Sequence, residues 1–156
     1  RMAMVGLRQP DAFDRALAFA LKWEGGFSDD PDDPGGATMR GVTQRVYDAY
    51  RDSIKLPHQS VKFISEAEVL GIYHERYWKA AGCDALPPAL AIAVFDTAVN
   101  CGVKQALKFL ARTGTAATFL AEREAFYKKL VEQKPRMAKY LKGWLNRVAA
   151  LRKEIA

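Results

Sequence analysis

The chain has 156 residues and a mass of 17.4 kDa, which is the length of one domain and excludes a large multidomain enzyme. Hydrophobic residues make up 49% and charged residues 27%, a composition that predicts a packed core and excludes long intrinsic disorder. We therefore expect residues 1–156 to form a single domain that folds on its own.

The net charge of +6 is unevenly distributed along the chain. Residues 1–103 carry 11 Lys or Arg against 14 Asp or Glu, a net charge of −3, whereas residues 104–156 carry 13 against 4, a net charge of +9. Such a block favours a polyanionic partner, namely nucleic acid, an anionic membrane face or a cell-wall polymer, and a solvated lysine-rich helix face is the alternative. Because no helix-turn-helix glycine spacing or aromatic-basic RNA motif accompanies it, we expect no nucleic-acid partner.

Membrane spans, disulfides and metal sites have no clear signal in the sequence. No apolar run reaches the roughly 18 to 20 residues of a membrane span, and residues 1–10 contain no apolar stretch of signal-peptide length. Cys83 and Cys101 lack CxxC spacing and are too few for a disulfide framework, so we interpret both as reduced core thiols. His58 and His74 show no ligand pairing, and we expect no metal and no cofactor.

Helical periodicity dominates the chain, starting with a helix over residues 11–24. Phe13, Leu17 and Glu24 fall on one stripe of that helix, and two glycines follow it. The next segment, FSDDPDDPGGATMRG, has the composition of turns and predicts a long structured loop or a small hairpin layer. The only strand candidates are short pieces within residues 27–43 and one near residues 61–64.

Capping signals and apolar periodicity predict the remaining helices. Thr43 is a plausible N-cap, Ser65 with Glu68 forms a capping box, and Pro88 and Gly102 bracket a helix that is apolar nearly all round. That apolar pattern indicates a central buried helix. The predicted helices cover residues 42–51, 65–78, 87–101, 103–111, 115–132 and 135–153. The fold class is therefore mainly α, with a small β-hairpin layer after the first long helix.

Glu24 is the residue whose position suggests chemistry. It ends an apolar stripe beside Trp23 and the carbonyl groups of a helix C-terminus, an environment that disfavours its charged form. A carboxyl group of this kind is a candidate general acid, and Gly25 and Gly26 leave room for a bulky substrate. The alternative is a helix-end glutamate that points to water.

The sequence around Glu24 resembles the start of the glycoside hydrolase family 108 N-acetylmuramidases, which are phage and bacterial lysozyme-like enzymes. The resemblance rests on Glu24-Gly25-Gly26-Phe27 and on an Asp-Pro-Gly-Gly loop, residues 33–36, followed by Thr38, Gly41 and Thr43. It implies a lysozyme-like fold, and it implies that Glu24 is the catalytic residue within a lobe over residues 11–80.

The second half of the chain resembles the peptidoglycan-binding region that usually follows in this family. Residues 95–102, FDTAVNCG, resemble its central helix and residues 140–148, YLKGWLNRV, its closing helix, within a helical lobe over residues 85–153. The chain lacks the Asp-Gly, Gly-Pro segment expected between Gly114 and Thr115.

Glycoside hydrolysis usually needs a second carboxylate on the other face of the sugar. Asp33 stands nine residues after Glu24, a spacing that resembles that of phage lysozymes, and turn formation is the alternative role for Asp33 and for its neighbours Asp29, Asp30 and Asp32. Further candidate site residues are two hydroxyls that can position a water, two aromatic residues that can line a sugar cleft and one amide at a helix end: Thr38, Thr43, Phe27, Tyr47 and Asn100. Thr43 and Asn100 have helix capping as the alternative, and the aromatic residues have core packing.

From these observations we expect a peptidoglycan hydrolase that cleaves the MurNAc–GlcNAc β-1,4 bond, with Glu24 as the general acid. We further expect a monomeric phage endolysin, made in the host cytoplasm and acting on the periplasmic cell wall. A non-catalytic peptidoglycan-binding module and a lytic transglycosylase are the alternatives.

The basic last third is expected to provide an electrostatic surface for the anionic envelope. An apolar face at helical spacing, Leu141, Trp144, Leu145, Val148 and Leu151, is predicted to pack the last helix onto the central one. The cations predicted to lie outside are Lys128, Lys129, Lys134, Arg136, Lys139, Lys142, Arg147, Arg152 and Lys153.

Overall fold

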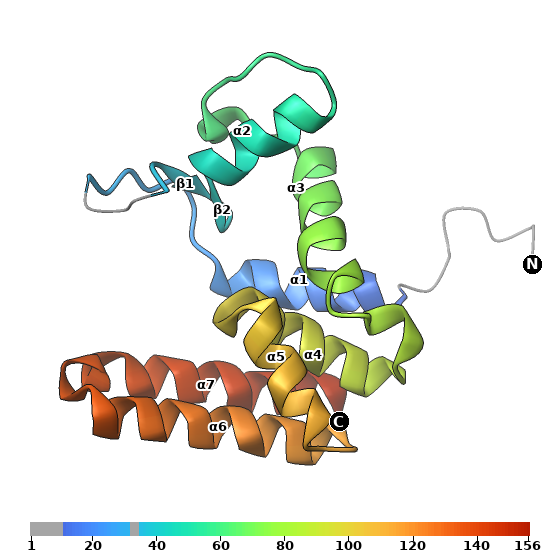
Figure 1. Ribbon diagram of the computed structural model, residues 1–156, viewed down its shortest axis with the longest axis vertical. Coiled ribbons are helices and arrows are strands. Elements are labelled where there is room, and N and C mark those ends of the chain that lie inside the picture. Colours follow the sequence, from blue (N-terminus) through green and yellow to red (C-terminus); the bar gives the residue numbers. More distant parts are fainter. Residues whose placement is uncertain (1–10, 32–34) are drawn as a thin grey trace, which may run out of the picture.

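The computed structural model describes residues 11–31 and 35–156, which form a mainly helical molecule with one small hairpin (Figure 1). In chain order the elements are α1 (Ala12–Trp23), β1 (Thr38–Met39), β2 (Val42–Thr43), α2 (Gln44–Ser53), η2 (Val61–Phe63), α3 (Glu66–Tyr73), η3 (His74–Lys79), η4 (Cys83–Ala85), α4 (Pro88–Cys101), α5 (Val103–Ala111), α6 (Ala116–Gln133), η5 (Pro135–Met137) and α7 (Ala138–Ile155).

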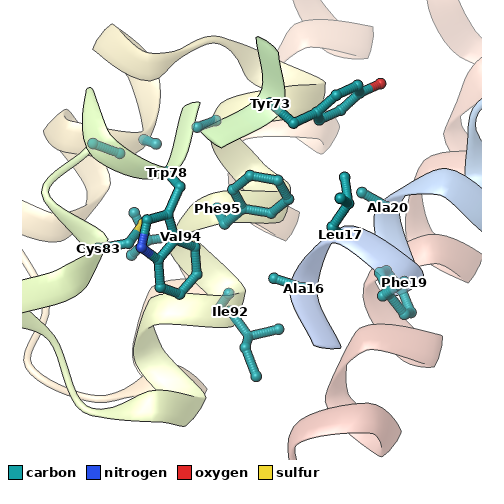
Figure 2. Packing of buried hydrophobic residues seen from close by; sticks show 14 of the residues in the cluster. Ala16, Leu17, Phe19, Ala20, Tyr73, Trp78, Cys83, Ile92, Val94 and Phe95 are labelled. Atoms are coloured by element: carbon teal, nitrogen blue, oxygen red, sulfur yellow. The ribbon is translucent and has the colours of Figure 1, made fainter. Parts of the chain in front are cut away.

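Helix α4 is the centre of the molecule. It packs against α1, α5, α6 and α7, and its residues from Leu90 to Ala98 are all buried. Phe95 lies among Trp78, Tyr73 and the α1 residues Ala16 and Leu17 in Figure 2, and its ring centroid is 5.8 Å from that of Trp78. The prediction of a central buried helix is confirmed: α4 is apolar nearly all round because other elements pack against it on each face.

The hairpin β1–β2 pairs Thr38 with Thr43 and Met39 with Val42 in an antiparallel register. Its two-residue turn contains Arg40 at φ 51° and Gly41 at φ 79°, and positive φ at both central residues is the signature of a type I′ turn. A bridge between Ser28 and Thr38 extends the layer. In Figure 1 the hairpin and α2 lie on one side of α1, opposite α6 and α7.

Helices α6 and α7 run antiparallel and pack side by side (Figure 1). The predicted apolar face of α7 packs into the core as expected: Val148 and Leu151 are buried, and Leu141, Trp144 and Leu145 are partly buried. This face packs α7 against α6 as well as α4.

The structure confirms the mainly helical prediction with a small hairpin after the first helix. Ser65 and Glu68 form the predicted capping box, and Gly102, at φ 95°, is the C-cap of α4. The strand predicted near residues 61–64 is wrong, since these residues form the 3₁₀ turn η2, capped by the side chain of Ser60. Both cysteines are free thiols, and burial raises the pKa of Cys83 to about 12.

Asp33 and Asp32 lie outside the described residues. None of the helices formed by residues 11–31 and 35–156 combines the length and the hydropathy that a membrane span requires.

Candidate functional site

Glu24 is the C-cap residue of α1, where the helix stops and the chain becomes extended. Its backbone N–H donates to the carbonyl of Ala20, and its φ and ψ are −89° and 142°. The side chain is 23% exposed, and Trp23 beside it is 40% exposed. The sequence predicted an apolar environment that disfavours the charged form of Glu24. In the structure the carboxylate is instead paired with an arginine.

Arg147 of α7 donates from Nη1 to Glu24 Oε2 across 2.9 Å. The arginine side chain is only 6% exposed, although it comes from the most basic part of the sequence. The prediction that Arg147 belongs to the outer basic surface is wrong, because its guanidinium points inward between two carboxylates.

Asp96 of α4 is the second carboxylate bound by Arg147. Its Oδ1 accepts from Arg147 Nη2 at 2.7 Å and its Oδ2 accepts from Arg147 Nε at 3.0 Å, a bidentate pair. Arg123 Nη1 of α6 donates to the same Oδ2 at 2.9 Å. Burial by itself would lower the pKa of Arg147, but the hydrogen bonds and charges of Asp96 and Glu24 outweigh it and raise that pKa.

The network continues from Arg123 to the end of α4. Arg123 Nε donates to the hydroxyl of Tyr127 at 2.8 Å, and Tyr127 in turn donates to Asn100 Oδ1. The thiol of Cys101 also contacts Asn100 and Tyr127. Asn100, predicted to bind a substrate amide, is thus half-buried, with its carbonyl oxygen engaged by α6.

The tip of the hairpin lies against Glu24 on the other side. A Cβ at Gly41 would be 3.0 Å from Glu24 Cγ and 3.0 Å from Oε1, so the absence of a side chain lets the turn approach the carboxyl group. The hydroxyl of Tyr73 donates to the Arg40 carbonyl at 2.7 Å and fixes this turn to α3. Burial, assisted by the charge of Glu24, raises the pKa of Tyr73 well above its ordinary value.

The other predicted site residues of the first half have different surroundings. Thr38 and Thr43 face each other across the hairpin, and Thr43 Oγ1 accepts from Val46 N at 3.2 Å as the N-cap of α2. Phe27 is 45% exposed, three residues beyond Glu24. Tyr47 is fully buried, and its hydroxyl donates to Glu68 Oε1 at 2.7 Å, so its ring is a core residue of the first half rather than part of an open surface.

The sequence did not predict that Arg147 binds Glu24 or that Asp96 holds Arg147. A signal for Arg147 existed: it lies three residues after Trp144 and four before Leu151, on the apolar stripe of α7. Asp96 is the single charged residue in the otherwise apolar helix α4. A charge at such a position must find a partner when it is buried.

Comparison with known proteins gives the family. The sequence model described as Glycosyl hydrolase 108 matches residues 17–102, more than half of the chain, including Glu24 and the hairpin. The chain belongs to this family. Glycosyl hydrolase 108 members are named for the hydrolysis of glycosidic bonds, so the chain is a glycosyl hydrolase with a carbohydrate substrate. No curated protein matches the chain.

The family-108 chain also has a structural relative. It is similar to a solved structure of SagA from Brucella abortus, at 26% sequence identity and a TM-score of 0.72, over 92% of both chains. The similarity extends beyond the 17–102 match into the last helices, which supply Arg123 and Arg147. The mainly helical, lysozyme-like fold predicted from the sequence is confirmed for this family-108 chain.

The site of this hydrolase offers acid–base chemistry. Glu24 has one oxygen bound by Arg147 and the other beside the hairpin turn, and glycosidic bond cleavage requires a carboxyl group that protonates the leaving oxygen. Among residues 11–31 and 35–156, no three His, Cys, Asp or Glu side chains gather as a metal site would require.

Proposed function

We propose that the chain is an N-acetylmuramidase that hydrolyses the MurNAc–GlcNAc β-1,4 bond of peptidoglycan, with Glu24 as the general acid. The observation that carries this proposal is the carboxyl group of Glu24 in a glycosyl hydrolase: Arg147 holds its Oε2, and its Oε1 lies beside Gly41, the turn residue that has no side chain. The resemblance of residues 24–43 to the family's muramidases supports the substrate.

The proposed reaction needs a partner for Glu24 on the opposite face of the sugar. Asp33, at the lysozyme-like spacing, is the proposed second carboxylate, and Thr43 with Thr38 is proposed to position the water from the hairpin. Phe27 offers an exposed ring, to which a sugar can stack. Glu24 protonates the glycosidic oxygen, the C1–O bond breaks, and water supplies the new hydroxyl at C1.

The experiment that tests Glu24 is the Glu24→Gln variant on purified peptidoglycan. General acid catalysis is typically worth about 10²–10⁴-fold, and we expect a loss of turnover at the upper end of that range with an unchanged melting temperature. Glu124→Gln is the matched control, because Glu124 is also a half-buried carboxylate paired with an arginine, Arg152, at 2.8 Å. Turnover by Glu24→Gln within about threefold of the parent would contradict the assignment.

Mass spectrometry of the reaction products separates the related activities. A reducing-end muramic acid supports the proposed muramidase, whereas an anhydro-muramic end would identify a lytic transglycosylase and a reducing-end glucosamine would identify a glucosaminidase. Binding to sacculi without any new ends would identify a non-catalytic peptidoglycan-binding module.

The biological setting belongs to the same proposal. We infer a monomeric phage endolysin, made in the host cytoplasm and acting on the periplasmic wall. Cells that produce the protein in the cytoplasm are then expected to lyse when the inner membrane is permeabilised and to remain intact otherwise. Lysis without permeabilisation would contradict this setting and leave the chemistry of Glu24 unaffected.

A further inference from the structure

Arg147 connects the proposed acid to the buried charged residues Asp96 and Arg123. Three of its donors are used: Nη1 binds Glu24 at 2.9 Å, Nη2 binds Asp96 at 2.7 Å, and Nε binds Asp96 at 3.0 Å. Glu24 lies at the end of α1, Asp96 on α4 and Arg147 on α7. One planar group thus joins three helices, and two of the joined residues, Glu24 and Arg147, are 123 residues apart in sequence.

The orientation of this guanidinium is fixed from behind. The bidentate contact with Asp96 defines the plane of the group, because the donors of an arginine form a rigid fork. Asp96 is itself fully buried and held by Arg123 Nη1 at 2.9 Å, and Arg123 is fully buried too. Asp96 and Arg147 are both buried, so the bidentate contact fixes the orientation of the guanidinium and directs its third donor, Nη1, at Glu24.

The charges show that Asp96 does not depend on Arg147 alone. Arg123 already neutralises Asp96 in the core. Nη1 of Arg147 is directed at Glu24, whose side chain is 23% exposed and reaches the surface. Because Arg123 already pairs with Asp96 in the core, neutralising Asp96 does not account for the contact of Arg147 with Glu24.

We propose that Arg147 is the positioning residue of the glycosidase site, acting through Glu24. It holds Oε2, so that Oε1, the oxygen beside Gly41, is the one that gives its proton to the glycosidic oxygen. Asp96 acts one step further back by orienting Arg147. This inference rests on the proposed role of Glu24 as the general acid, and it assigns the oxygen and the residue that fixes it.

The test compares Arg147→Lys with the parent on soluble glycan fragments from sacculi, measuring kcat and KM separately. A lysine retains the charge, but its donors share one nitrogen instead of forming a planar fork, so it cannot bind Asp96 bidentately and hold Glu24 at the same time. Because a misplacement of about 1 Å can cost roughly 10²-fold in rate, we expect kcat to fall about 10- to 100-fold while KM stays within twofold. Arg147→Met, which keeps the volume and removes the donors, is expected to lose at least as much.

Arg51→Lys is the matched control. Arg51 donates to Glu68 Oε2 at 3.0 Å, and both side chains are 13% exposed, so this pair resembles Arg147–Glu24 in type and burial but lies between α2 and α3. We expect Arg51→Lys to lower the melting temperature without changing kcat per folded molecule. For the Arg147 variants, too, kcat is calculated per folded molecule, so that a loss of stability is not counted as a loss of turnover.

The outcomes distinguish this inference from the proposed function. An unchanged kcat in a folded Arg147→Lys or Arg147→Met, with Glu24→Gln inactive, overturns the positioning role and leaves the general acid in place. A loss of kcat that merely follows the unfolded fraction, as in Arg51→Lys, also overturns it. An active Glu24→Gln refutes the proposed function itself, whatever Arg147 does.

Discussion

At the scale of single residues, the site is defined by what approaches Glu24. The helix stops at Glu24, so its side chain leaves the α1 stripe and meets Arg147 on one oxygen. Gly41 supplies the opposite wall, at a distance that only a residue without a Cβ permits. The position of the carboxyl group is thus determined by a buried charge on one side and a missing side chain on the other.

Gly41→Ala is expected to damage both stability and activity. The new Cβ would overlap the hydroxyl of Tyr73 and press on Glu24, and alanine at φ 79° is strained in addition. Overpacking and backbone strain together are expected to cost about 2–4 kcal/mol in the free energy of unfolding, measured by chemical denaturation. Turnover is expected to fall in the folded fraction, because Glu24 is displaced.

The control for this variant is Gly82→Ala. Gly82 has a φ of 71°, and no atom lies within 4 Å of its Cβ position, so only the backbone strain applies, at roughly 1–2 kcal/mol. A smaller loss of stability for Gly41→Ala than for Gly82→Ala, or full turnover in folded Gly41→Ala, would show that the close approach to Glu24 has no consequence.

Asp33→Asn is expected to reduce turnover more than Asp29→Asn or Asp32→Asn. Asp33 alone has the lysozyme-like spacing from Glu24, and the substitution removes the charge without changing the size of the side chain. Steady-state rates on sacculi, with the melting temperature of each variant, provide the measurement. Equal effects from all three substitutions would point to folding of the loop rather than to chemistry.

At the scale of elements, the hairpin connects the surroundings of Glu24 to α2 and α3. Its turn is bound to α3 through Tyr73, and its second strand ends in Thr43, which caps α2. A two-stranded hairpin is marginally stable by itself, so its shape depends on these attachments. The attachments to α2 and α3 therefore hold the hairpin turn next to Glu24.

Thr43→Ala is expected to lower the free energy of unfolding by about 1 kcal/mol, because the N-cap hydrogen bond to Val46 N is lost. Thr43→Ser is expected to restore most of that stability, since serine caps equally well. Kinetics of the same two variants test the proposed water-positioning role: an activity loss in Thr43→Ala that exceeds the stability effect and is restored by serine supports it. Unchanged turnover in Thr43→Ala would reduce Thr43 to a cap.

At the scale of the whole molecule, charge and burial divide the basic last third into two groups. In the first group, Arg123 and Arg147 are buried and pair with Asp96, and Arg147 also pairs with Glu24. Arg152 is half-buried and paired with Glu124. The remaining cations predicted for the outer surface are exposed: Lys128, Lys129, Lys134, Arg136, Lys139, Lys142 and Lys153. The electrostatic surface is therefore carried mainly by lysines of α6, α7 and the turn between them.

Binding to purified sacculi is expected to weaken as salt rises, because the Debye length shortens from about 10 Å at 0.1 M to about 3 Å at 1 M. Reversing Lys128, Lys134 and Lys139 to Glu is expected to weaken binding further, with little change in melting temperature, since these side chains are exposed. Pull-down at the two salt concentrations measures both effects.

A matched triple reversal outside the basic block separates local from overall charge. Lys55, Arg76 and Lys79 are exposed residues of the first half, and their reversal changes the net charge by the same amount. We expect it to affect wall binding less than reversal of the α6–α7 lysines. Binding that responds to neither salt nor the α6–α7 reversal would leave the basic block as an ordinary solvated face.

The sequence by itself determined the helices and singled out Glu24 as the candidate acid. Ser65 with Glu68, Thr43 and Gly102 act on backbone groups no more than four residues away, so their effects can be inferred without knowing the fold. The motif at residues 24–43 is also a continuous stretch of sequence, so its resemblance to the family can be recognised without knowing the fold. The sequence of α4 also predicted a central helix, since a helix that is apolar nearly all round can bury every face only in the core.

Only the tertiary structure decided which side chains meet at Glu24. Arg147 is 123 residues away, and in the sequence it is one cation among many in a basic block. Tyr47 and Asn100 had two possible roles each, and packing placed Tyr47 in the core and bound Asn100 to Tyr127. The physical reason is that pairing of a buried charge depends on the relative placement of α1, α4, α6 and α7, which is set by packing of their apolar faces and by no local signal.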